Sequence, residues 1–107
     1  MDTETIKREL RIGKRALAAA RAISNQVIAD KFELPKATVT DIIYMKKNLG
    51  HPDAELILGL YNERLDDAEL AERYTIGAIA ERYGISEHRV KRIAQKVHAE
   101  MLEEGEL

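Results

Sequence analysis

Two stretches of this chain repeat one pattern of apolar residues 51 positions apart. The segment IADKFELPKATVTDI (28–42) aligns without a gap with IAERYGISEHRVKRI (79–93), and four positions are identical. Four further positions are chemically similar, and the register extends upstream, where Ile6 aligns with Ile57. Because self-similarity at a fixed period indicates a repeated structural unit, we interpret the chain as a tandem duplication of about 50 residues.

Each copy is expected to contain three helices. The apolar residues that predict a first amphipathic helix recur at helical spacing: Ile6, Leu10, Gly13, Leu17 and Ala20. Ser24 is a suitable N-cap for a second helix, and Pro35 suits the first turn of a third. The segment NLGHPD (48–53) then ends that third helix and begins the next copy.

The second copy repeats this plan with a longer first helix, from about 53 to 74, in which Asp66 can cap a new helix near LDD. Its last helix is expected to begin after Ser86 and to run to about Glu104. The predicted fold class is all-α, a tandem duplication of a three-helix unit with about six to seven helices. We place copy one at 1–49 and copy two, with an acidic C-terminal helix end, at 53–107.

Gly84 lies where one helix of the second copy must stop and the next must begin. Glycine adopts a positive φ without steric cost, which suits the residue that follows a helix. The spacing around it resembles the helix-turn-helix superfamily of DNA-binding proteins, on these residues: Ile79, Ala80, Tyr83, Gly84, Ile85, Val90 and Ile93. Copy one has a similar set, with Glu33 in place of the glycine: Ile28, Ala29, Phe32, Leu34, Val39 and Ile42. The resemblance implies two helix-turn-helix units of the compact kind that phages and mobile elements encode, with a strain of about 1 kcal/mol at Glu33.

The distribution of charge is more informative than its sum. The chain has 17 Lys/Arg and 19 Asp/Glu, a formal net charge of -2, whereas most nucleic-acid-binding domains are basic. Residues 1–53 sum to +3 and residues 54–107 to -5. Residues 86–96 oppose that trend, because four basic side chains accompany Glu87 alone. We expect a local basic surface there, with Arg89, Lys91 and Arg92 on one side of the helix.

The resemblance also implies which side chains would meet DNA, because the second helix of each pair enters a major groove. In copy two these are Ser86, Glu87, His88, Arg89, Lys91, Arg92, Gln95 and Lys96. In copy one they are Lys36, Thr38, Thr40, Tyr44, Lys46 and Lys47, with the lysines near the helix end. Arg and Lys donate to guanine or phosphate, Gln pairs with adenine, and Thr methyls suit thymine. Asp41 would either accept from a cytosine amino group or repel the DNA backbone.

Several other classes of function find no support in the sequence. There is no Cys, and the three histidines lack metal-ligand spacing, so we expect neither a metal site nor a thiol nucleophile. No phosphate loop, nucleophile elbow or paired catalytic carboxylate occurs, so we expect no enzyme, no cofactor and no small-molecule ligand. No apolar run approaches the roughly 18 residues that a membrane span needs, so we expect a cytoplasmic protein, in the host cell if it is phage-encoded.

Two functional hypotheses follow. The first is a sequence-specific double-stranded DNA-binding protein, a small transcriptional regulator that reads two major grooves. The alternative is a protein-interaction or accessory module that uses the same shape, in polymerase docking, DNA packaging or recombination. The acidic tail (100–106) and the apolar run AELILGLY (54–61) favour at least one protein contact, with a homodimer or another protein partner through the apolar helix 54–61.

Overall fold

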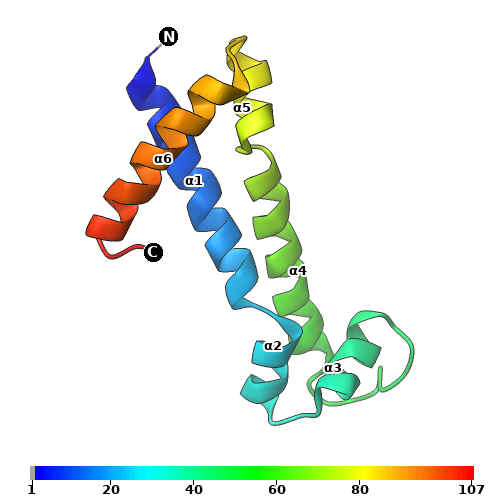
Figure 1. Cartoon of the computed structure of the whole chain (residues 1–107). Coiled ribbons are helices and arrows are strands. Elements are labelled where there is room, and N and C mark those ends of the chain that lie inside the picture. The colour runs from blue at the N-terminus through cyan, green and yellow to red at the C-terminus, as the bar shows by residue number, and fades with distance from the viewer. Residues whose placement is uncertain (1) are drawn as a thin grey trace. The chain divides into compact units, whose positions relative to one another are not determined.

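The computed structural model describes residues 2–107, which form six α-helices and no strand (Figure 1). The helices are α1 (Thr3–Ala22), α2 (Asn25–Phe32), α3 (Lys36–Ile43), α4 (Ala54–Glu72), α5 (Ile76–Tyr83) and α6 (Glu87–Glu103). The prediction of an all-α fold with six to seven helices is therefore confirmed. None of the helices in residues 2–107 has the length and apolarity that a membrane crossing requires.

The helices pack into two compact units that differ from the sequence halves 1–49 and 53–107. Unit 1 contains residues 2–16 and 69–107, and unit 2 contains residues 17–68. The reason is that the start of α1 packs on the core of α5 and α6, whereas the start of α4 packs on the core of α2 and α3. Ile6 of α1 is buried with Ile79 of α5, and Ile57 of α4 is buried with Ile28 of α2. The segment 48–53, expected to separate the copies, therefore lies inside unit 2.

The core of unit 1 joins the start of α1 to α5 and α6. Its buried residues are Ile6, Leu10, Ile79, Ala80, Val90, Ile93, Val97 and Met101. At its edge, the Tyr83 hydroxyl donates to Glu9 Oε1 at 2.8 Å, and the Arg82 guanidinium lies 3.2 Å from the same oxygen. Leu17, expected on the buried stripe of α1, is 40% exposed, because the helical repeat carries the stripe from Gly13 to Ala16 instead.

The core of unit 2 joins α2 and α3 to the first half of α4. Its buried residues are Ile28, Ala29, Val39, Ile42, Ile43, Ala54 and Ile57. The apolar run at 54–61 is thus largely used within the unit, since Leu58, Leu60 and Tyr61 also pack on this core. Leu56 is the exception, at 61% exposed. The expected helix start near LDD does not occur, because α4 continues through Asp66 to Glu72.

The turns within the α2–α3 and α5–α6 pairs have the same hydrogen bonds. Ser24 and Thr75 cap α2 and α5, each accepting from the backbone N–H three residues later. Glu33 (φ 54°) and Gly84 (φ 63°) follow the two helices in the left-handed region. The next N–H in each turn donates to the carbonyl of Ala29 or Ala80, at 2.9 and 3.1 Å. The positive φ expected at Glu33 is therefore confirmed, and the same hydrogen bonds form around Glu33 and Gly84.

This equivalence predicts opposite effects for two exchanges. Glu33→Gly should raise the free energy of unfolding by up to about 1 kcal/mol, because it relieves a left-handed residue that carries a Cβ. Gly84→Ala should lower it by about 1 kcal/mol, because no atom beyond its chain neighbours lies within 4 Å of the added Cβ and only the backbone is strained. Urea titrations of both variants measure these changes, and a stabilised Gly84→Ala would contradict the argument.

Helix α3 is shorter than expected and ends at Ile43. Met45 adopts a positive φ of 55°, which stops the helix. The Lys46 N–H then donates to the Asp41 carbonyl at 2.8 Å, and the Met45 N–H donates to the Ile42 carbonyl at 3.1 Å. Lys46 and Lys47 therefore lie in the loop after α3 and not near the end of a longer helix.

Candidate nucleic-acid interface

Helix α6 is anchored on one side and exposed on the other. The Ser86 hydroxyl caps it by accepting from the Arg89 N–H at 3.1 Å. Four residues at helical spacing fix its inner side: Val90, Ile93, Val97 and Met101. All eight residues that the sequence predicts for DNA contact in this segment are exposed: Ser86, Glu87, His88, Arg89, Lys91, Arg92, Gln95 and Lys96.

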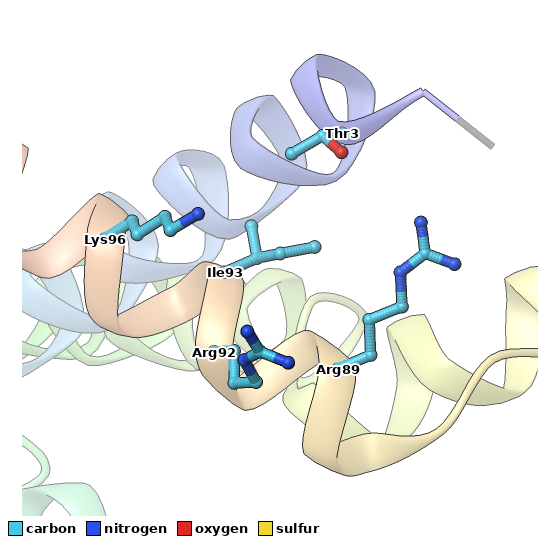
Figure 2. A pocket seen from close by; sticks show the side chains of 5 residues that line it. All are labelled: Thr3, Arg89, Arg92, Ile93 and Lys96. Atoms are coloured by element: carbon cyan, nitrogen blue, oxygen red, sulfur yellow. The ribbon is translucent and has the colours of Figure 1, made fainter.

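The exposed side of α6 has two flanks, and each borders its own hollow. One hollow, of about 210 Å³, is lined by Thr3, Arg89, Arg92, Ile93 and Lys96 (Figure 2). The other, of about 540 Å³, is lined by Lys14, Ile76, Lys91, Ala94, Gln95 and His98. The expectation that Arg89, Lys91 and Arg92 share one side is therefore wrong. Adjacent helical positions are rotated by about 100°, which carries Lys91 to the opposite flank.

The cations of α6 are free of ion pairs among residues 2–107. We call Arg89, Lys91, Arg92 and Lys96 the basic face of α6, and none of the four lies within 4.0 Å of a carboxylate oxygen in this part of the chain. A Glu87 carboxylate oxygen lies beside Gly77, 3.2 Å from where a Cβ would stand. This position is the first turn of α5, where the helix dipole favours negative charge. The positive charge of the basic face is thus left available to a ligand.

The acidic end of α6 contacts α1 instead of remaining free. Glu100 accepts from Lys7 Nζ and from Arg11 Nη2, both at 2.9 Å. Arg11 Nη1 also donates to Glu104 at 2.7 Å. Glu106, beyond the helix, accepts from Arg15 Nη2 at 2.8 Å. The tail expected to contact another protein is therefore paired within unit 1, because its carboxylates lie opposite the basic side of α1.

The bonds that Lys7 and Arg11 make to Glu100 and Glu104 shift the pKa values of these four groups. The hydrogen bond from Lys7, and then that from Arg11, lowers the pKa of Glu100. The hydrogen bond from Arg11 lowers the pKa of Glu104, and the same bonds raise the pKa values of Lys7 and Arg11. Each shift favours the charged form of its group, so the cluster is fully ionised near neutral pH.

Acidification is expected to destabilise unit 1 through Glu100 and Glu104. Their folded pKa values lie below 4.5, the ordinary value, so the native state binds fewer protons than the unfolded chain. Their stabilising contribution is present above pH 4.5 and is lost as pH falls through the folded values. Thermal unfolding followed by circular dichroism from about pH 7 to about pH 3 should show a falling Tm.

Arg11→Gln should weaken this pH dependence, because it removes a donor that lowers both pKa values. Arg8→Gln is the matched control, since Arg8 is an exposed cation on the same helix. Parallel Tm profiles for the Arg11→Gln variant and the wild type would reject this role for the cluster.

The corresponding surface of unit 2 is less basic. Lys36, Tyr44, Lys46 and Lys47 are exposed, whereas Thr38 and Thr40 are half-buried. The Thr40 hydroxyl donates to the Lys36 carbonyl at 3.0 Å, so it is already engaged. Lys47 Nζ lies 3.7 Å from Asp41, which places a carboxylate beside one of the three predicted lysines. Lys36 and Lys46 are the cations of this surface that have no ion pair within residues 2–107.

No protein-family model matches the chain, and no curated protein or solved structure shows significant similarity to it. The case for an interface therefore rests on the side chains of α6 and α3.

Two residues of α1 that border α6 were not among the predicted site residues. Thr3 and Lys14, both on α1, line the two hollows beside the basic face of α6. Both are more than 70 residues from α6 in the sequence, and no motif includes them. Because α1 was expected to pack in its own copy, no signal placed them beside α6.

Proposed function

We propose that the protein binds double-stranded DNA in a sequence-specific manner, as a small transcriptional regulator, with α6 in a major groove. The observation that carries this proposal is the basic face of α6, four exposed cations without an ion pair in residues 2–107. Lys7 and Arg11, two other cations of unit 1, are by contrast paired with carboxylates. Four like charges on one helix repel one another when no carboxylate pairs with them, whereas a polyanion would compensate them.

The flanks of α6 and the strip between them would contact different parts of the DNA. The basic residues on both flanks would meet phosphates, because a helix in the major groove has a DNA strand on each side. His88 and Gln95 lie on the outermost strip of α6, between the two flanks, which we call the crest. Their side chains can hydrogen-bond to base edges. Arg92 lies between the crest and one flank, so its guanidinium can reach guanine. Sequence preference would therefore depend on the crest residues and Arg92.

We further propose that α3 makes a second and weaker contact in another major groove. Its support is the exposed pair Lys36 and Lys46 together with Tyr44. Two grooves on one DNA face lie roughly 34 Å apart, so two contacts would protect more than one helical turn. Footprinting with a verified monomer distinguishes the cases, since protection of about one turn would leave α6 as the sole reading helix.

The experiment that tests the proposed function is selection of bound sites from random DNA, followed by salt titration of the best site. The slope of log affinity against log salt should fall by nearly one unit for each phosphate contact removed. The triple variant Arg89→Ala, Lys91→Ala, Arg92→Ala should lower both affinity and slope. The charge-matched control Arg8→Ala, Arg21→Ala, Lys31→Ala removes three exposed cations from other helices. Equal affinities for the two triple variants would reject DNA reading by α6.

A second candidate function is protein interaction through unit 2. A hollow of about 400 Å³ between α2 and α4 has an apolar lining that includes Phe32, Leu56 and Leu60. Leu56 is 61% exposed, and apolar side chains around a hollow favour contact with another protein. If a second copy of the chain binds there, sedimentation should show a concentration-dependent dimer that Leu56→Asp abolishes. A monomer at all concentrations would exclude this homodimer.

A further inference from the structure

The hollow beside the start of α1 has an almost entirely cationic polar lining. Arg89, Arg92 and Lys96 border it from α6, and Thr3 borders it from the first turn of α1. Figure 2 shows the Arg89 side chain extending from α6 toward the N-terminal end of α1, and the Lys96 side chain pointing toward Ile93, which lies between the two cations in this view. Ile93 is 7% exposed and supplies an apolar wall. Two chain segments more than 80 residues apart in the sequence thus form one small site.

The carboxylates closest to this hollow in the sequence are engaged elsewhere. Asp2 Oδ1 accepts from the Glu4 N–H at 3.0 Å and so caps α1. The Glu4 carboxylate lies 4.0 Å from Lys7 Nζ, one turn further along α1. Neither carboxylate is within ion-pair distance of Arg89 or Lys96. The hollow therefore keeps a net positive charge.

We propose that this hollow binds one phosphate group, supplied by the DNA backbone, an inference that rests on the proposed function. The Arg89 guanidinium can donate two parallel hydrogen bonds to phosphate oxygens, and Lys96 adds a compact charge. The Thr3 hydroxyl can donate a further hydrogen bond. The hollow has a volume of about 210 Å³, which admits a phosphate group together with a few water molecules. One water molecule occupies roughly 30 Å³.

The position of the hollow favours a backbone phosphate over a base. It lies on a flank of α6, beside the crest that carries His88 and Gln95, and the flanks of a groove-bound helix face the sugar–phosphate strands. A phosphate held between α6 and α1 would fix the depth and rotation of α6 in the groove. The start of α1 would thus take part in DNA binding although it belongs to the first sequence copy.

The test uses duplexes of the selected site, each with one phosphate replaced by an uncharged methylphosphonate. For the wild type, one position should weaken binding about tenfold, the loss expected for a charge-assisted hydrogen-bond set. In the double variant Arg89→Ala, Lys96→Ala, the same replacement should cost less than about twofold, because the partner of that phosphate is already absent. Arg8→Ala, a control outside the hollow, should retain the full loss. The inference is overturned if every position costs the double variant as much as the wild type.

A second measurement separates this inference from the proposed function. Inorganic phosphate and pyrophosphate are titrated into the protein while the backbone amides of Thr3 and Ile93 are followed by NMR. If the wild type binds no DNA but these amides shift, and do not shift in the double variant, the proposed function fails and the hollow takes a free phosphate. If the wild type binds no DNA and neither amide shifts with phosphate or pyrophosphate, both proposals are rejected.

Discussion

Replacing Arg92 by Ala is expected to weaken binding to the selected DNA site by about 1–3 kcal/mol, the loss typical of an arginine that donates to a guanine edge. Folding should change little, since Arg92 is exposed and lies outside the core of unit 1. Fluorescence anisotropy titrations at fixed salt measure the loss. The same variant should bind unselected DNA almost as well as the wild type does, because a contact to a base edge contributes mainly to binding of the selected site.

Arg92→Lys distinguishes base reading from simple charge. Lysine retains the positive charge but lacks the planar fork that donates two hydrogen bonds, so a base-reading Arg92 should lose most of its preference for the site. A lysine variant with wild-type preference would show that Arg92 contacts phosphate alone. Exchange of Arg8 for Lys provides the matched control, because both side chains are exposed cations of unit 1.

Gly13→Ala is expected to destabilise unit 1 by about 1–3 kcal/mol, the usual cost of overpacking a core. An added Cβ would stand 2.7 Å from Tyr74 Cβ and 3.1 Å from the Tyr74 carbonyl oxygen. Neither atom is the end of a flexible side chain, so the backbone of α1 or of the Tyr74 segment must move. The Arg82 guanidinium lies 5.5 Å from the centre of the Tyr74 ring, which restrains that ring further.

Gly59→Ala provides the control for this prediction. Gly59 lies inside α4, and no atom outside its local helix lies within 4 Å of the added Cβ. Alanine should therefore stabilise α4 by up to about 1 kcal/mol through helix propensity alone. Urea denaturation of both variants gives the free energies of unfolding. A Gly13→Ala protein as stable as the Gly59→Ala protein would show that α1 does not approach Tyr74 this closely.

Local features of the fold were predictable because they depend on neighbouring residues. Ser24 and Ser86 cap the N-termini of α2 and α6, and Gly84 ends α5. Each of these roles is indicated by the residue type alone. The end of α3 was missed because its left-handed residue is Met45, a residue type that gives no such signal. The predicted break near LDD was wrong because the good helix formers after Asp67 continue α4.

Which helices pack together could not be predicted from the sequence pattern, for a different reason. Ile6 and Ile57 align at the 51-residue offset and are equally apolar, so by sequence pattern either could cover either core. Periodicity identifies a buried face but not its partner. The hollow that Thr3 shares with Arg89 and Lys96 depends on that pairing, and so does the neutralisation of Glu100 by Lys7.

The packing of the start of α1 on α5 and α6 also determines the order in which the chain can fold during synthesis. Unit 2 is one continuous segment, 17–68, so its core can close once those residues have left the ribosome. Unit 1 must wait, because Ile6 and Leu10 find their partners only when Val97 and Met101 have been added. Until then the apolar residues at the start of α1 lack the partners in α6 that bury them.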